Sequence, residues 1–266
     1  MKRLAKIPKG LWNRLPFLSS RTNPSPPRRW NKWDNYRALF EGQPGFEIGG
    51  PTPLFGREGL LPLYPLLSSV DNCNFSPFTI WEGAVQEGWH FHYDDQKPPG
   101  YQYICEAVAL SRIASETYAV ILSSHTLEHI ANPLQALQEW ARILKPGGHL
   151  LLVLPDKKRT FDHRRPVTAF AHLLDDFERS VGEEDLTHLP EILALHDLRL
   201  DQPAGTPDQF KERSEHNYEN RCLHQHVFDG NLVAQMLRHC GLQRVMIKRI
   251  PPFHIVAIGR KDVITN

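Results

Sequence analysis

The sequence contains few cysteines and no long apolar run. Its four cysteines, at positions 73, 105, 222 and 240 of 266, form no C-x-x-C pair. The usual cysteine-based zinc and redox motifs are therefore excluded, and we expect reduced thiols in a cytoplasmic protein. No apolar stretch approaches the roughly 18 residues that a membrane-spanning helix needs. A secretory signal is not expected either, because Pro8, Lys9 and Asn13 interrupt the apolar residues near the N-terminus.

Acidic residues are missing from the first 30 positions, which hold eight of the 31 basic residues. The rest of the chain has 23 basic and 30 acidic residues, so its net charge is −7. We expect a flexible basic arm over 1–30. Either its apolar residues make weak contact with a membrane surface, or the arm is simply solvated. The acidic body excludes nucleic acid as the expected partner, because binding phosphates needs concentrated positive charge.

The most informative stretch of the chain is 118–156. An apolar run over 118–122 predicts a buried strand. Asn132 and Pro133 then predict a helix start, and apolar residues from Leu134 to Leu144 recur at three- and four-residue spacing. The sequence Lys-Pro-Gly-Gly over 145–148 ends this helix, and 149–154 predicts a second strand. Strand, helix and strand in this order predict a right-handed parallel crossover.

This block resembles the class I S-adenosylmethionine (SAM) dependent methyltransferases. The shared features are S-S-H-x-L-E-H over 123–129 after the strand and L-K-P-G-G over 144–148 before the next strand. The resemblance implies a Rossmann-like α/β fold, SAM as the cofactor and methyl transfer as the activity. It also implies that Ser124 contributes to cofactor binding.

The predicted cofactor loop follows a first strand over 45–48. Glu47, Gly49 and Gly50 stand where the family carries acid-x-Gly-x-Gly-x-Gly, but Pro51 and Pro53 replace later glycines. Glycine lets the backbone turn sharply beside a ligand, whereas proline fixes φ and removes an amide donor. This loop must therefore take a different path from the usual one.

Three further residues complete the expected cofactor site. An apolar stretch over 66–70 predicts a second strand that ends at Asp71, a position from which a carboxylate can accept hydrogen bonds from ribose hydroxyls. A third strand over 101–105 ends at Glu106 and Ala107, which the resemblance places beside the adenine. A helix-capping role for Glu106 is the alternative.

The C-terminal part predicts how the sheet closes. A helix over 231–240 is followed by strands over 243–249 and 253–259, which are joined by a short turn and are therefore antiparallel. We expect one methyltransferase domain over 31–266, with a mostly parallel sheet, an antiparallel last strand and a polar cap insertion over 157–223. The cap suits a small polar acceptor, of which a sugar or glycan hydroxyl is one candidate.

Residues 125–129 also match H-x-x-E-H, a pattern of zinc hydrolases. That chemistry requires His125 and His129 on one helical face. A strand ends directly before His125 and the helix is predicted to start only at Asn132, so we expect no metal in the site and keep zinc hydrolysis as an alternative.

Candidate groups for the reaction itself lie after the strand ends. One of His125, His129 and His163 is expected to accept the acceptor's proton, because neutral histidine titrates in the useful range. Arg164 and Arg165 are candidates for binding a carboxylate or phosphate of the acceptor, unless they lie in a solvated turn. A catalytically inactive binding or scaffold protein is the alternative to an enzyme.

Overall fold

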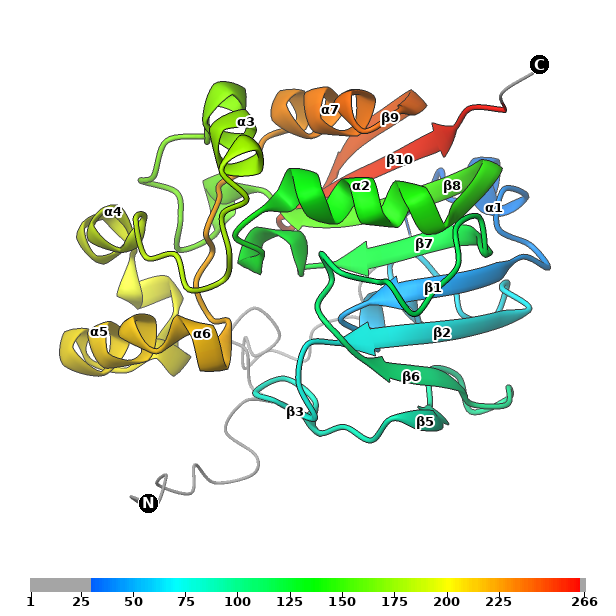
Figure 1. Ribbon diagram of the computed structural model, residues 1–266, viewed down its shortest axis with the longest axis horizontal. Helices are drawn as coiled ribbons and strands as arrows, with labels where there is room; N and C mark the ends of the chain where they lie inside the picture. The colour runs from blue at the N-terminus through cyan, green and yellow to red at the C-terminus, as the bar shows by residue number, and fades with distance from the viewer. Residues whose placement is uncertain (1–29, 264–266) are drawn as a thin grey trace.

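The computed structural model describes residues 30–263, so the predicted basic arm lies almost entirely outside the described residues. The described chain is built on an eight-stranded sheet with the order β5-β6-β2-β1-β7-β8-β10-β9 (Figure 1). The strands are β1 (Pro44–Ile48), β2 (Ser69–Asn74), β5 (Gly88–Phe91), β6 (Gly100–Ile104), β7 (Tyr118–Ser124), β8 (Leu144–Pro155), β9 (Leu242–Ile250) and β10 (His254–Lys261). A separate hairpin pairs β3 (Phe78–Thr79) with β4 (Gly83–Ala84).

The five strands from β6 to β8 in this order run parallel to one another. The last strand, β10, is antiparallel to both of its neighbours, β8 and β9. A short connection between β9 and β10 requires this reversal. The predicted α/β fold with a mostly parallel sheet and an antiparallel last strand is confirmed.

Three helices cover one face of the sheet: α2 (Pro133–Ile143), α3 (Phe170–Glu178) and α7 (Gly230–His239). The side-chain oxygen of Asn132 accepts a hydrogen bond from the backbone N–H of Gln135, and this interaction starts α2 where the sequence predicts it. Leu134, Leu137 and Trp140 are fully buried in the same core cluster as the inward residues of β8. The amphipathic pattern therefore predicted both the helix and the face that it buries.

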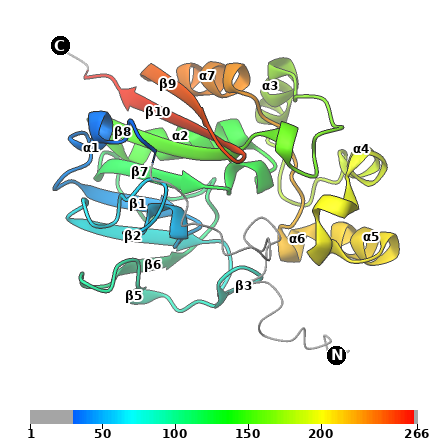
Figure 2. The ribbon, with the colours of Figure 1, turned by 180° about the vertical axis from the view of Figure 1, so that it is seen from behind.

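The opposite face is covered without long helices (Figure 2). Within the described residues, the connection from β1 to β2 contains only a short 3-10 turn, Pro53–Phe55, and the region before β1 contains the one-turn helix α1 (Asp34–Arg37). Large apolar side chains of this irregular covering pack together, including Phe55, Leu61 and Tyr64. The predicted second strand at 66–70 is wrong in its bounds, because β2 begins at Ser69 and runs to Asn74.

The polar insertion after β8 contains α3, α4 (Leu189–Leu195), α5 (Pro207–Glu215) and α6 (Asn217–Asn220). The parallel strands point toward the side on which α4, α5 and α6 lie (Figure 1). This cap has a small core of its own, made of Ile192, Ala204, Phe210 and Leu223. None of the helices described over 30–263 has the length and apolarity to cross a bilayer.

Candidate active site

The chain turns sharply after β1, at the carboxyl edge of the sheet. Gly49 has a φ of +79°, and its N–H donates to the carbonyl of Cys73 at 2.9 Å. A Cβ on Gly49 would lie 2.7 Å from Thr126 Oγ1, and one on Gly50 would collide with the carboxyl group of Glu47. Both glycines are therefore required by close packing within the turn, which differs from the glycine-rich form of the family.

Glu47 lies directly below this turn and is fully buried. Its Oε2 accepts a hydrogen bond from the Tyr64 hydroxyl at 2.8 Å, and its Oε1 has no partner among the described residues. Burial raises the pKa of Glu47 to about 8, because the one hydrogen bond from Tyr64 does not offset the loss of solvation. Glu47 is therefore protonated at neutral pH and can donate a hydrogen bond.

The prediction that Asp71 ends the second strand is wrong. Asp71 is the third residue of β2, and its carboxylate accepts hydrogen bonds from the Tyr101 N–H at 2.7 Å and the Tyr118 hydroxyl at 2.6 Å. Tyr118 begins β7, so this cluster lies toward the amino end of the parallel strands. Asn74 occupies the carboxyl end of β2 instead, and its amide donates to the carbonyl of Gly50 at 3.4 Å.

Several buried polar atoms along this edge lack hydrogen-bond partners. Among the described residues these atoms are Glu47 Oε1, Asn72 Nδ2, Ser123 Oγ and Ser124 Oγ, which come from the neighbouring strands β1, β2 and β7. Buried polar groups usually have a partner, so such a row indicates a missing polar ligand. Donors and acceptors of this kind fit the hydroxyl groups of a nucleoside.

Glu106 and Ala107 follow β6 at the same edge, where the sequence predicts them. Both carboxylate oxygens of Glu106 accept hydrogen bonds from Arg221, at 2.7 and 3.3 Å. The carbonyl of Ala107 accepts from the indole N–H of Trp140 at 3.0 Å. These acceptors are thus engaged by the cap and by α2, and the structure gives no separate support for a contact with adenine.

His125 and His129 do not share a helical face. His125 has a left-handed backbone, with φ +52°, and only a single 3-10 turn, Leu127–His129, follows it. The ring of His125 contacts His254 at 3.0 Å, whereas His129 Nδ1 lies 3.0 Å from the carbonyl of Leu223. The helix that H-x-x-E-H zinc chemistry needs is absent from this stretch of the described chain, so the zinc-hydrolase alternative loses its geometric basis.

The predicted cap residues are engaged in contacts within the cap. His163 is paired with Asp197 at 3.0 Å, and Arg164 contacts the same carboxylate at 3.1 Å. The side chain of Arg165 is only 1% exposed and donates to Asp162, to Glu191 and to the backbone of the segment after α6. Arg165 therefore stabilises the cap, and its predicted role in acceptor binding is wrong because none of its donors faces a free space.

Asp162 pairs with a residue that sequence reasoning missed, His224. Its Oδ2 lies 2.5 Å from His224 Nδ1. Burial alone would raise the pKa of Asp162, but the charges of His224 and Arg165 lower it to about 2. Burial likewise opposes the charged form of His224, but the carboxylate of Asp162 raises its pKa above the ordinary value. The two side chains form a carboxylate–imidazole pair.

This pair faces the residues that follow β7. One ring nitrogen each of His129 and His224 and one oxygen of Glu128 lie within 4.8 Å of one another, a grouping that could also hold a cation. Burial lowers the pKa of His129 to about 4, so its ring is neutral at physiological pH. The ring of Trp81 lies 5.2 Å from that of His129. Because 62 residues separate Asp162 from His224, no local spacing in the sequence could have indicated the pair.

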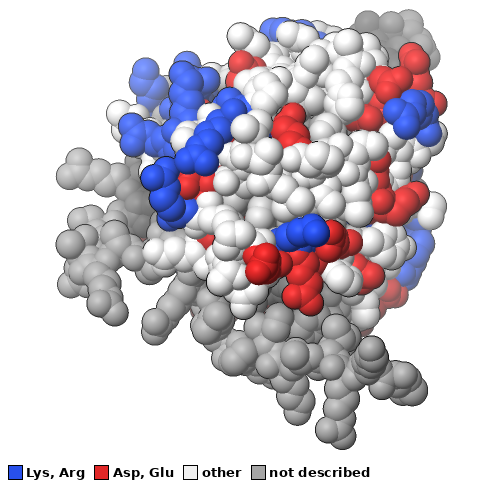
Figure 3. Space-filling model, turned by 90° about the vertical axis from the view of Figure 1, so that its left-hand side faces the viewer, with Lys and Arg blue, Asp and Glu red and all other residues white. Residues whose placement is uncertain are grey.

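The surface on the cap side carries charges of both signs. Lysine and arginine gather most densely on one part of this face, and elsewhere they lie among aspartate and glutamate (Figure 3). Two surface hollows lie elsewhere: one of about 500 Å³ between α7 and β9, and one of about 400 Å³ beside β8, β9 and β10. Neither is lined by the polar row of the sheet edge or by the Asp162–His224 pair, so neither is assigned to the reaction.

Comparison with known proteins places these features in a family. The methyltransferase domain family matches residues 56–244. A segment of 53 residues is 36% identical to a ubiquinone biosynthesis O-methyltransferase of Parvibaculum lavamentivorans, and it spans 20% of this chain and about a fifth (21%) of that relative's length.

Two solved structures with which the chain was compared are named as SAM-dependent methyltransferases. A SAM-dependent methyltransferase from Aquifex aeolicus has a TM-score of 0.45 and 14% identity, with 86% of this chain and 87% of that chain covered. One from Mesorhizobium loti has a TM-score of 0.47 and 10% identity, with 86% and 97% covered. With the family match over 56–244 and this strand order, the chain belongs to the methyltransferase domain family and has a class I, Rossmann-like fold.

Proposed function

We propose that this protein transfers a methyl group from SAM to an oxygen of a small polar molecule, with a sugar or glycan hydroxyl as one candidate. The observation that carries the proposal is the 2.5 Å Asp162–His224 contact beside the carboxyl edge of a methyltransferase sheet. An oxygen acceptor must lose a proton during methylation, and an imidazole supported by a carboxylate is suited to accept it. The name of the Parvibaculum relative, an O-methyltransferase, is consistent with this acceptor.

The cofactor would lie along the row of unpartnered polar atoms at the strand ends. SAM supplies a methyl group on a positively charged sulfur. Glu47, held neutral by burial, would donate through its proton, and Asn74 would take the ribose position first assigned to Asp71. Gly49 and Gly50 allow the close packing of this turn. The hydroxyl of Ser124, which has no hydrogen-bond partner among the described residues, would be available to the cofactor.

His224 would act as the general base. Its Nδ1 is held by Asp162, which leaves Nε2 to take the proton from the acceptor hydroxyl. Asp162 then stabilises the positive imidazolium that results. His129, whose Nδ1 donates to the Leu223 carbonyl, presents an unprotonated Nε2 that can accept a hydrogen bond and orient the acceptor. Trp81 supplies an apolar wall next to His129, as a sugar ring would need.

Calorimetric titration with S-adenosylhomocysteine separates an enzyme from a scaffold. We expect saturable binding to the wild-type chain and an affinity about fivefold lower in Asn74→Ala, since a net hydrogen bond contributes about 1 kcal/mol. Asp71→Asn is the matched control, because its contacts lie toward the other end of the strands. Wild-type protein that does not bind would favour the scaffold, and Asp71→Asn with the larger loss would restore the ribose role to Asp71.

The base is tested with His224→Gln, which keeps a donor for Asp162 but cannot take a proton. We expect turnover to fall roughly 100-fold or more at pH 8, with unchanged S-adenosylhomocysteine affinity. In the wild type, activity should rise with pH as His224 loses its proton, and the variant should lack this rise. The exposed His92→Gln is the control. A variant with the wild-type rate and pH profile would remove His224 from the mechanism.

A further inference from the structure

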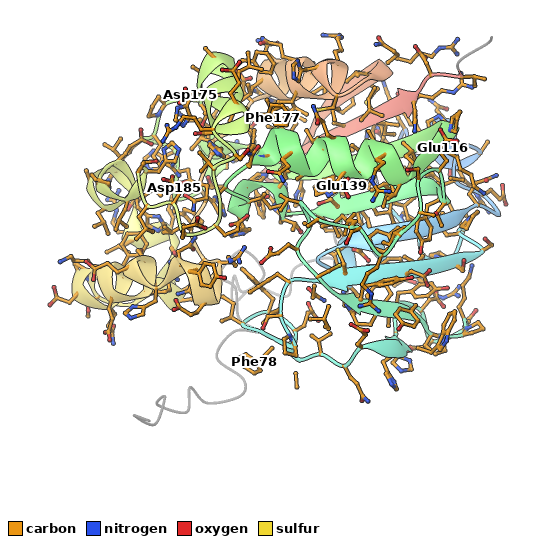
Figure 4. The ribbon with its side chains drawn as sticks, viewed as in Figure 1. Phe78, Glu116, Glu139, Asp175, Phe177 and Asp185 are labelled. Carbon is orange, nitrogen blue, oxygen red and sulfur yellow. The ribbon has the colours of Figure 1, made fainter. Side chains whose placement is uncertain are left out.

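Four metal-binding side chains gather beside α3, apart from the sheet edge. One ring nitrogen each of His172, His188 and His226 and one oxygen of Asp176 all lie within 4.8 Å of one another. His172 and Asp176 are four residues apart on α3 and so share one helical face. His188 comes directly before α4, and His226 lies in the segment that returns from the cap toward α7. Asp175 on α3 and Asp185 in the loop before α4 mark this region in Figure 4.

Two donor atoms lie about as far from His172 Nε2 as neighbouring donors do in a tetrahedral site. His172 Nε2 lies 3.0 Å from His188 Nε2 and 3.2 Å from Asp176 Oδ2. Donors bound at zinc–ligand distances of 2.0–2.2 Å in a tetrahedron are roughly 3.3 Å apart. The ring of His226 borders this group, since its Nε2 lies 3.8 Å from Asp176 Oδ2. Closing four donors around one ion requires this ring to present its other nitrogen, Nδ1, to the remaining three.

Two of these side chains are buried and carry atoms that have no hydrogen-bond partner within residues 30–263. His226 is 1% exposed, and its Nε2 lies 2.9 Å from the carbonyl of Ala131, which can only accept. The proton is therefore on Nε2, and the lone pair of Nδ1 has no partner. Asp176 is 4% exposed, and its Oδ2 makes no hydrogen bond. A histidine held by a carbonyl on one nitrogen, with the other nitrogen open, is the usual arrangement of a metal ligand.

We propose that His172, Asp176, His188 and His226 bind one zinc ion. Three imidazoles and one carboxylate suit zinc and disfavour calcium and magnesium, which prefer oxygen ligands. Four protein donors fill a tetrahedral ion and leave no open position, so the site is structural. The ion would join α3, the start of α4 and the segment after the cap. The four ligands are spread over 55 positions without a recognised spacing, so no local pattern in the sequence indicates this ion.

Zinc content and zinc-dependent stability test the proposal in the full chain, purified without a histidine tag. After chelation and zinc titration we expect one zinc per chain and a rise in Tm. His188→Ala, which removes a half-buried ligand, and Asp176→Asn should both lose the bound zinc and the rise. The exposed His216→Ala should keep both. His129→Ala should also keep them, because it disrupts only the Glu128, His129 and His224 grouping.

Cobalt substitution reports the site without relying on any variant. Co²⁺ added to the metal-free wild type should give the strong visible absorption of a tetrahedral ion, and zinc should displace it. The proposal is overturned if the wild type takes up neither ion, if the absorption is that of an octahedral ion, or if His188→Ala and Asp176→Asn keep full zinc content. Loss of zinc in His129→Ala, with zinc retained in His188→Ala, would move the site to the other grouping.

Discussion

Three buried acids of this protein respond differently to burial. Glu47 has one neutral hydrogen-bond donor, Tyr64, and burial raises its pKa to about 8. Burial also dominates at Glu183, where Arg221 offsets it only in part and the pKa is about 7. Asp162 is as deeply placed, but His224 and Arg165 together hold its pKa near 2. The number of cationic partners, and not burial alone, decides which acids are charged.

Glu47 predicts a measurable pH dependence of stability. The folded state keeps the Glu47 proton up to about pH 8, whereas the unfolded chain releases it near pH 4.5. Between these values the folded state binds more protons, so stability falls as pH rises and levels off above about pH 8. Glu47→Gln removes this loss. We expect the variant to be more stable than the wild type by on the order of 5 kcal/mol at pH 9 and by less than about 1 kcal/mol at pH 5.

Urea denaturation at both pH values measures this difference. Glu41→Gln is the matched control, because Glu41 is exposed and its pair with Arg37 lies in solvent. The control should differ from the wild type by less than about 0.5 kcal/mol at either pH. A Glu47→Gln variant that is less stable than the wild type at pH 9 would show that Glu47 is charged in the folded protein.

At single positions, sequence reasoning succeeded where the structure depends on neighbours in the chain. Asn132 caps α2 through Gln135, three residues later, and Gly49 turns the chain directly after β1. It could not find the partner of Asp162, because the fold brings in His224 from 62 residues away. Such a partner depends on the path of the cap, which no local pattern describes.

At the level of elements, periodicity predicted the helices that cover one face and most strands. The exception is instructive: the apolar run at 66–70 predicts a strand, but Leu66 and Leu67 belong to the irregular segment that covers the other face. A buried irregular segment and a buried strand have the same composition. Composition alone therefore could not locate β2. The misplaced strand led to the wrong prediction that Asp71 lies at its carboxyl end.

The start of α2 is expected to be unusually sensitive to substitution. Asn132 is 2% exposed, its Oδ1 accepts from the Gln135 N–H, and its Nδ2 donates to the carbonyl of Asp176 at 3.0 Å. Asn132→Ala removes the cap and also leaves the Asp176 carbonyl without this donor. We expect a loss of roughly 2–3 kcal/mol in the free energy of unfolding, measured by urea denaturation.

Thr206→Ala is the comparison for this prediction. Thr206 caps α5 with a capping box, but it lies at the surface and holds no second element. Its replacement should cost about 1 kcal/mol. Equal losses in the two variants would mean that the contact between Asn132 and α3 adds nothing to the stability of the fold.

Across the whole molecule, Arg221 joins the cap to the sheet. Its guanidinium lies 2.7 Å from Glu106, which follows β6, and 3.0 Å from Glu183 in the cap. It also lies over the ring of Phe75, which follows β2, at 4.8 Å. The Arg221 side chain is 8% exposed, so these charges attract each other in poorly solvated surroundings. Arg221 thus contributes to holding the cap beside the carboxyl edge of the sheet.

We expect Arg221→Gln to loosen the cap while the sheet stays folded. The change leaves Glu183 buried without its cation, which should cost roughly 2–4 kcal/mol above pH 7, where Glu183 is ionised. Hydrogen exchange should therefore become faster over 183–221 and stay slow in α2 and β8. Arg179→Gln breaks an exposed pair with Asp175 and should change exchange little. Two results would contradict this prediction: an unchanged exchange rate over 183–221 in Arg221→Gln, or an equal increase of the rate in α2. Either would mean that apolar contacts hold the cap in place and that the Arg221 ion pairs do not.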